Sequence, residues 1–185
     1  MLQGYAANLQ ASILDKESSG DYTAVNSLGY AGGYQFGASA LETLGYLKPG
    51  SSSAGNKAAM ADPANWTGKG NASSLDDFLN NPALQDDVFQ QNVDFNLNVL
   101  KKNGKVSDLT PRDQITGLLA ASHLLGAGGA SNDLASTDAN GTSGQDYYLM
   151  GVAAYSPQKS SSNDFVQKFF SKSAAGITQA EPTPA

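Results

Sequence analysis

The spacing of apolar residues along the chain predicts a series of amphipathic helices, and no alternating pattern of any length predicts a strand. The stretch at residues 111–125 is apolar nearly all round, so we expect it at the centre of the fold. The predicted helices cover residues 2–17, 38–47, 75–80, 82–102, 111–125, 145–155 and 163–172. The pattern therefore predicts an all-α fold, with at most a small hairpin near the start.

Local signals mark the starts of two of these helices. Ser74 is a predicted N-cap for residues 75–80, because its side chain can accept a hydrogen bond from a free backbone N–H of the first turn. Asn81 followed by Pro82 repeats the signal, with a cap and then proline at the first helical position, and predicts the start of residues 82–102.

Two irregular connections interrupt the helices. Residues 49–74 are rich in Gly, Ser and Asn around the only tryptophan, Trp66, and such a long connection is usually functional or mobile. Residues 126–144 are predicted to be a loop. A chain of 185 residues suits one domain. We expect this domain to span residues 1–175, with residues 176–185 as a flexible tail or linker.

The charge balance narrows the range of partners. The formal net charge is −6 at pH 7, charged residues make up 15% of the chain, and Lys and Arg form no run. Such a chain lacks the basic footprint of a nucleic-acid-binding protein. No segment approaches the roughly 20 apolar residues of a membrane span. We therefore expect neither nucleic-acid binding nor membrane insertion.

The chain contains no cysteine and a single histidine, His123. Disulfides and thiolate metal sites are therefore excluded, and one histidine does not build a zinc site. Residues 136–147 share part of the spacing of a calcium loop but lack a carboxylate at its first and last positions. We expect no metal and no cofactor. Taken alone, a histidine on a buried helix is more often a core residue than a functional one.

Glu17 stands at the end of the first predicted helix, where a loop dense in Gly, Ser, Asn and Tyr begins. A glutamate at a helix end is most often a solvated side chain. A partly buried carboxylic acid can instead hold a proton and deliver it to a leaving oxygen, because burial disfavours its charged form. The loop supplies aromatic faces and uncharged hydrogen-bonding groups, which together are typical of a carbohydrate groove. These groups are Tyr22, Tyr30, Tyr34 and Phe36, with Ser18, Ser19, Asn26 and Gln35.

The segment ESSGDYTAVNSLGYAGGYQ, residues 17–35, resembles the first catalytic motif of the soluble lytic transglycosylases and the related goose-type lysozymes. That motif begins with Glu-Ser-Ser or Glu-Ser-Gly and ends with Gly-x-x-Gly-x-x-Gln. Gly29, Gly32 and Gln35 fall at the family's spacing from Glu17. The sequence GYQFG, which replaces the common Met-Gln, is closer to the sequences of phage-encoded members of the family.

Two later segments continue the resemblance. ASHLLGAGGA, residues 121–130, stands where the family carries Ala-Tyr-Asn-Ala-Gly-x-Gly. His123 takes the position of the family's Tyr and Leu124 that of its Asn. The family also has a tyrosine that begins a helix facing the catalytic glutamate. That tyrosine corresponds to Tyr147 or Tyr148, and we prefer Tyr148.

The resemblance implies a lysozyme-like helical domain that cleaves the MurNAc–GlcNAc bond of peptidoglycan. It implies that Glu17 acts first as the acid and then as the base. From the position of His123 in the family motif, the resemblance implies that this histidine contacts the substrate or Glu17. The residues expected to line the groove are Ser18, Tyr34, Gln35, Phe36, His123 and Tyr148.

The number of acids bears on the mechanism. Asp21 is the only acid between Glu17 and Glu42, and we expect it to bind its own loop backbone. Retaining glycosidases need a second carboxylate roughly 5 Å from the acid, and inverting ones need a more distant base. A single acid suits a lytic transglycosylase, with a hydrolytic muramidase as the close alternative. A non-catalytic wall-binding or structural hub module is the alternative from another class, favoured by His123 and Leu124.

The expected partner is the peptidoglycan glycan strand. The N-terminal segment has no basic opening and no unbroken apolar block, so we expect no signal peptide. Delivery by a phage tail, a virion or an injection machine is then expected, and other proteins of that particle would be further partners.

Overall fold

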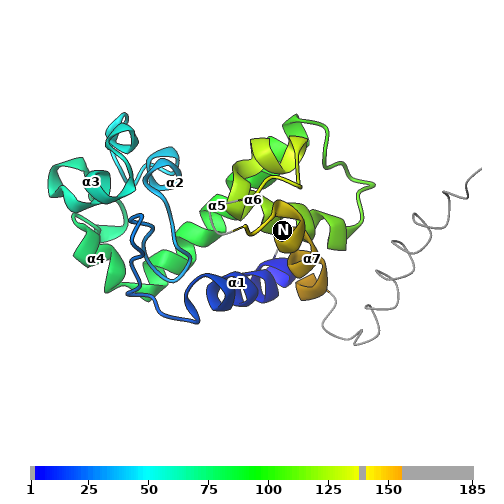
Figure 1. Ribbon diagram of the computed structural model, residues 1–185, viewed down its shortest axis with the longest axis horizontal. Helices are drawn as coiled ribbons and strands as arrows, with labels where there is room; N and C mark the ends of the chain where they lie inside the picture. Colours follow the sequence, from blue (N-terminus) through cyan, green and yellow to red (C-terminus); the bar gives the residue numbers. More distant parts are fainter. Residues whose placement is uncertain (1–2, 138–140, 156–185) are drawn as a thin grey trace, which may run out of the picture. The chain divides into compact units, whose positions relative to one another are not determined.

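The computed structural model describes residues 3–137 and 141–155, and within them it is helical with no sheet (Figure 1). The all-α class is therefore confirmed. The α-helices are α1 (Gln3–Ser18), α2 (Ala38–Thr43), α3 (Asn56–Ala61), α4 (Leu75–Leu79), α5 (Pro82–Lys102), α6 (Arg112–Asn132) and α7 (Gly144–Tyr155). The short 3-10 helices are η1 (Ser51–Ala54), η2 (Pro63–Asn65) and η3 (Lys69–Asn71). None of the helices in these ranges is long and apolar enough to cross a membrane.

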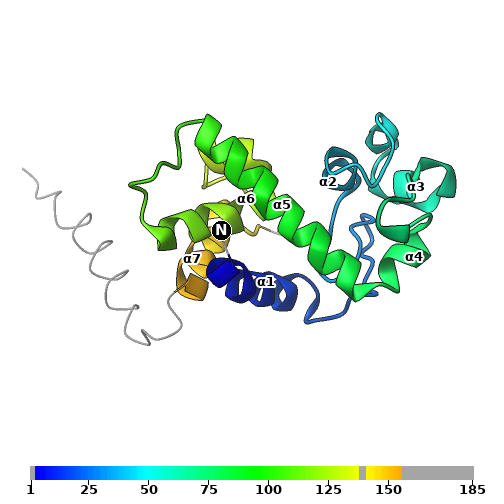
Figure 2. The same cartoon turned by 180° about the vertical axis from the view of Figure 1, so that it is seen from behind.

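Helix α5 connects two groups of elements (Figures 1 and 2). Helices α2, α3 and α4 gather near its first residues and, together with the turns around them, form what we call the small lobe, residues 19–80. Helices α1, α6 and α7 pack against one another, and α1 and α6 also pack against α5. The loop after α1 leads from this helical group into the small lobe, so the candidate acid at the end of α1 lies at the junction.

Both predicted helix starts are confirmed. The Ser74 hydroxyl accepts a hydrogen bond from the backbone N–H of Asp77 at 3.1 Å, and α4 follows. The Asn81 side chain accepts from the backbone N–H of Leu84 at 3.1 Å, and α5 begins at Pro82. These caps satisfy backbone donors that a helix leaves free at its start, which explains why local sequence sets these two boundaries.

Two helix ends differ from the expectation. Helix α2 is shorter than residues 38–47 because the chain turns at Gly45, whose φ of 78° lies in the left-handed region. Helix α6 is longer than residues 111–125. Gly126 breaks its regularity with a φ of 67°, but the helix resumes and buries Ala127 and Ala130. The expected loop therefore begins later, because these small apolar residues still have a core to pack against.

The stretch around Trp66 is a packed part of the small lobe. The indole is 4% exposed, and its Nε1–H donates to the carbonyl of Met60 at 2.9 Å. Its ring lies 5.8 Å from that of Phe78. The residues that read as an irregular connection thus form short helices around a buried aromatic side chain. In place of the expected hairpin near the start, the described residues form isolated β-bridges, such as the one between Val25 and Ala31.

The predicted helix at residues 163–172 and the predicted tail at residues 176–185 lie outside the described residues. The expected domain boundary at residue 175 lies there as well.

A buried amide ties the loop after α1 to α5. Gln85 is 0% exposed, and its Oε1 accepts from the backbone N–H of Gly33 at 2.8 Å. Its Nε2 donates to the carbonyls of Phe78 at 2.9 Å and Tyr22 at 3.0 Å. One side chain therefore bonds backbone groups of both the loop after α1 and α4. Gly32 lets this contact form, since a Cβ there would lie 2.2 Å from Gln85 Oε1 and its φ is 79°.

We expect Gln85→Ala to lower the free energy of unfolding by about 2–4 kcal/mol, because buried backbone groups would lose their partners. Urea unfolding followed by circular dichroism measures the change. Asn98→Ala, at an exposed position of the same helix, is the control and should change stability by less than about 0.5 kcal/mol. Equal effects of the two substitutions would contradict the role assigned to Gln85.

Candidate functional site

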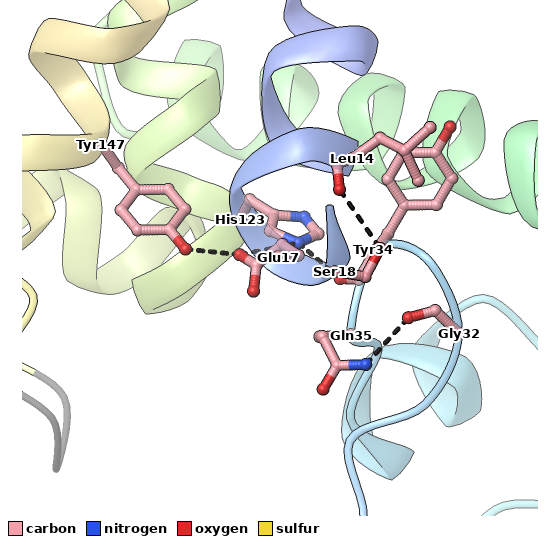
Figure 3. Close-up of polar contacts among 8 residues, drawn as sticks. All are labelled: Leu14, Glu17, Ser18, Gly32, Tyr34, Gln35, His123 and Tyr147. Atoms are coloured by element: carbon pink, nitrogen blue, oxygen red, sulfur yellow. Dashed lines mark hydrogen bonds and ion pairs between the residues drawn. The ribbon is translucent and has the colours of Figure 1, made fainter. Parts of the chain in front are cut away.

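Glu17 lies in the last turn of α1, where α6 and α7 approach it (Figure 3). Its side chain is 16% exposed. The Tyr147 hydroxyl donates to Glu17 Oε1 at 2.5 Å, and His123 Nε2 lies 3.6 Å from the same oxygen. The second carboxylate oxygen points away from both of these side chains (Figure 3). One oxygen of the candidate acid is thus fixed by the protein, while the other is directed elsewhere.

The tyrosine that faces Glu17 is Tyr147, so the preference for Tyr148 is wrong. Successive residues of an α-helix point about 100° apart, so only one of the two neighbours can face α1. The Tyr148 ring instead packs over Gly117 of α6, where a Cβ would lie 2.8 Å from it. Burial, with a smaller contribution from Asp113, raises the pKa of Tyr148.

His123 takes part in the site through one ring nitrogen. Nε2 lies 2.8 Å from the carbonyl oxygen of Tyr34. A carbonyl oxygen only accepts, so Nε2 carries the proton, and Nδ1 is left as a bare acceptor. Nδ1 is buried and has no hydrogen-bond partner among the described residues. The Nε2–H therefore donates to the Tyr34 carbonyl, and the same nitrogen lies 3.6 Å from Glu17 Oε1.

His123 is held in its neutral form. Its side chain is 7% exposed, and its ring lies 5.7 Å from that of Phe36 and 5.8 Å from that of Phe89. This burial lowers the pKa of His123, while the nearby Glu17 carboxylate and the Tyr34 carbonyl oppose the effect. At neutral pH the contact with Glu17 is therefore a long polar contact and not an ion pair.

The two polar residues predicted from the first motif are both at the site. The Ser18 hydroxyl donates to the carbonyl of Leu14 at 3.2 Å, within its own helix. Gln35 Nε2 donates to the carbonyls of Gly32 at 2.9 Å and Ala24 at 3.3 Å, which closes the loop on itself. The Gln35 backbone has a φ of 48°, and its amide oxygen points away from Gly32 (Figure 3). Gln35 thus shapes the loop and still presents an acceptor.

The aromatic residues Tyr34 and Phe36 are core residues and not open faces of a groove. Tyr34 is 0% exposed, and its ring stacks on Phe89 with 4.6 Å between ring centroids. Phe36 is 2% exposed. The expectation that the Tyr34 ring lines a groove is wrong, because the small lobe uses the ring to build its core. Phe36 also contributes to the lining of a cavity beside the site.

Asp86 of α5 is a site-supporting residue that the sequence pattern did not single out. Its Oδ1 accepts from the hydroxyls of Tyr34 at 2.5 Å and Tyr22 at 2.8 Å. Gln10 Nε2 of α1 donates to the Tyr34 hydroxyl at 2.8 Å. Burial and the hydrogen bond to Asp86 raise the pKa of Tyr34. No local signal could reveal this network, because the residues in each hydrogen-bonded pair are 24 to 64 positions apart in the chain.

A cavity of about 370 Å³ adjoins the site between the small lobe, α5 and α6. Gln35 and His123 lie in its lining, whereas Glu17 does not. No Asp, Glu, Lys or Arg lines it. Its lining residues are Tyr30, Gln35, Phe36, Gly37, Ser39, Ala40, Thr43, Asn56, Asn92, Phe95, Asn96, Ser122, His123, Leu125, Gly126 and Ala127.

Within residues 3–137 and 141–155, no three His, Asp or Glu side chains come together as metal ligands. Residues 136–147, whose spacing partly matches a calcium loop, include residues 138–140, which lie outside the described part.

Comparisons of the chain with protein-family models, with curated proteins and with solved structures give no match. The resemblance to soluble lytic transglycosylases and goose-type lysozymes thus stays a prediction from the motif residues.

We expect His123 to titrate with a midpoint below its ordinary value of 6.5. The unfolded chain then binds more protons than the folded one below that value. Stability should therefore rise as the pH increases toward about 6.5, the ordinary value in the unfolded chain, by at most about 1.4 kcal/mol per pH unit. NMR of the single histidine gives the midpoint, and imidazole nitrogen shifts give the tautomer. His123→Gln should flatten the rise. A midpoint at or above 6.5, or a proton on Nδ1, would contradict the assignment.

Proposed function

We propose that this protein cleaves the glycan strand of peptidoglycan at the MurNAc–GlcNAc bond, as a lytic transglycosylase with Glu17 as acid and base. The observation that carries the proposal is the Glu17 carboxylate, 16% exposed, with one oxygen held by Tyr147 beside an uncharged cavity. His123, whose Nε2 lies 3.6 Å from Glu17 Oε1, lines that cavity together with Gln35, which supports a common site.

The other acids around the site have structural roles, which supports a mechanism with one acid. Hydrogen bonds from neighbouring side chains and backbone N–H groups lower the pKa values of Asp21, Glu42 and Asp146. Carboxyl groups with lowered pKa values stay ionised and make poor proton donors at neutral pH. Asp86 is engaged by two tyrosine hydroxyls. Each of these carboxylates is thus engaged by hydrogen bonds of its own, and Glu17 is the acid that the proposal uses.

In the first step, protonated Glu17 donates its proton to the glycosidic oxygen that bridges MurNAc C1 and GlcNAc C4. The C1–O bond breaks, the GlcNAc hydroxyl leaves, and C1 becomes an oxocarbenium-like centre. The 2-acetamido group of MurNAc stabilises this centre. Oε2 suits the donor role, because Oε1 accepts from Tyr147 and the second oxygen points away from the protein contacts (Figure 3).

In the second step, the Glu17 carboxylate removes the proton from the C6 hydroxyl of the same MurNAc. The C6 oxygen then bonds to C1, which gives a 1,6-anhydro product and returns the proton to Glu17. A muramidase would use water in place of the C6 hydroxyl and give a reducing end. The role of Tyr147 in both cases is to hold the carboxylate in position while its charge changes.

The place of action follows from the substrate. We propose that the protein works at the cell wall, on peptidoglycan. Delivery by a phage tail, a virion or an injection machine stays a prediction from the sequence.

We expect Glu17→Gln to lower the release of soluble fragments from peptidoglycan sacculi by at least about a thousandfold, since the amide can neither donate nor accept the proton. Asp15→Asn is the matched control, because Asp15 is an exposed acid of the same helix. It should keep release within about twofold. Release that is equal in the wild type and Glu17→Gln would end the enzyme proposal and favour the wall-binding module.

Mass spectrometry of the released fragments separates the two reactions. Anhydro-ended fragments support the transglycosylase, and reducing ends support the muramidase.

We expect Tyr147→Phe to lower the rate of release by about 10- to 100-fold, because a hydrogen bond to the carboxylate is lost. Tyr148→Phe removes the same atom from the neighbouring position of α7, away from Glu17, and should leave the rate unchanged. Initial rates on sacculi measure both effects. A larger loss in Tyr148→Phe than in Tyr147→Phe would mean that the wrong tyrosine has been assigned.

A further inference from the structure

A second cavity, of about 570 Å³, lies between the end of α5, the connection at residues 103–111 and the start of α6. This connection is at the end of α5 away from the small lobe (Figures 1 and 2). Apolar side chains line the cavity, among them Leu97, Val106, Ile115 and Leu119. None of its lining residues lines the cavity beside Glu17. The second cavity is therefore a separate feature that the proposed reaction does not use.

Leu109, in the same connection, is the most exposed large apolar side chain of the described residues. It is 92% exposed, and the next, Leu28, is 59% exposed. Hydrogen bonds fix the turn that carries it: the Leu109 backbone N–H donates to Ser107 Oγ at 3.3 Å, and the Ser107 backbone N–H donates to Thr110 Oγ1 at 2.8 Å. Asp108 and Thr110, on either side of the leucine, line the second cavity. The exposed leucine therefore stands at the rim of an apolar hollow.

Both signs of charge stand around this cavity. The charged residues that line it are all exposed, and they are Asp94, Lys101, Asp108 and Arg112. Within the part of the chain that the structure describes, no ion pair joins Asp94, Lys101 or Asp108 to another side chain. Cations and carboxylates on one rim make a surface that can pair with a copy of itself, because each sign can meet its opposite there. A partner with charges of one sign only would meet like charges on this rim.

We propose that this surface is the contact between two copies of the chain related by a twofold axis. Leu109 of each copy enters the second cavity of the other copy. Asp108, next to the leucine, then comes to the rim of the other copy's cavity, where Lys101 of that copy lies. A twofold contact repeats every pairing, so the leucine is buried twice and the pair of Asp108 with Lys101 forms twice. The inference goes beyond the proposed function and does not rest on it.

The two parts of the contact have different effects. Removal of the leucine from water is the favourable term, since a side chain so exposed loses most of its contact with solvent in the cavity. The charge pairs set the orientation and exclude wrong partners more than they add affinity. Each copy has a net charge of −6, so two copies repel at long range, and opposite charges at the contact offset this repulsion. A dimer joined here carries two copies of the Glu17 site, and neither site supplies a lining residue to the contact.

The test is sedimentation velocity of the full chain at concentrations from about 5 to 200 μM. We expect the mass to rise to twice the 19.1 kDa of one chain and to stop there, because a twofold contact closes at two copies. Leu109→Ser should weaken the dimer by at least about a hundredfold, since both copies lose the apolar side chain. Leu28→Ser, at an exposed leucine of the small lobe, is the matched control and should leave the mass unchanged.

An exchange of charges gives a readout that a merely structural role would not move. Lys101→Glu and Asp108→Lys should each weaken self-association by at least about tenfold, because like charges would then meet twice. An equal mixture of the two variants brings opposite charges together at both pairs, so we expect a mixed dimer about as stable as the wild type. Lys57→Glu makes the first change of charge at an exposed position of the small lobe and should leave the dimer intact. Thermal unfolding checks that each variant is folded.

Three outcomes overturn the inference: a wild-type chain that keeps the mass of one copy over the whole range, a dimer that persists in Leu109→Ser, or charge variants whose mixture stays monomeric. A mass that grows beyond two copies overturns it as well, because a contact that repeats without closing is not twofold. The wild-type dimer, its loss in Leu109→Ser and its return in the mixture of Lys101→Glu with Asp108→Lys together support it.

Discussion

The burial of Tyr34 is the constraint on which the site depends. A phenol hydroxyl taken out of water must be paired, and Asp86 of α5 and Gln10 of α1 supply the partners at 2.5 and 2.8 Å. This fixes the loop after α1 against two helices. The carbonyl of the same residue then accepts from His123 of α6, whose Nε2 lies 3.6 Å from Glu17 Oε1. One buried residue thus sets the distance between the loop, the histidine and the acid.

Most aromatic residues of the small lobe are buried in its own core, and this decides where an exposed aromatic ring can lie. A group of short helices and turns has little apolar surface, so rings such as Phe78 and Trp66 must be buried for it to pack. The open rings come from the rim of the cavity instead, from Tyr30 in the loop and Phe95 on α5. The cavity wall is therefore built by a helix that no motif marks.

The space beside Glu17 is uncharged, whereas the chain as a whole is acidic. Acidic side chains dominate the net charge, yet those near the loop are engaged by local N–H and hydroxyl groups, as Asp21 and Glu42 are. His123 is neutral because it is buried between aromatic rings. Glu17 is therefore a carboxyl group with one structurally occupied oxygen beside an uncharged space, an arrangement suited to passing a proton to and from a neutral ligand.

The sequence by itself determined what depends on residues within a few positions of each other: the longer helices, the cap of α5 at Asn81, and the place of Glu17 where α1 ends. Only the tertiary structure decided which of two adjacent tyrosines faces that acid. Adjacent residues of a helix point about 100° apart, so only one of the two can face Glu17. The packing of α7 against α1 and α6 decides that this residue is Tyr147 and not Tyr148. Likewise, the tautomer of His123 is set by a carbonyl 89 residues away. Local patterns fix local hydrogen bonds, whereas pairings across the chain depend on how whole helices pack.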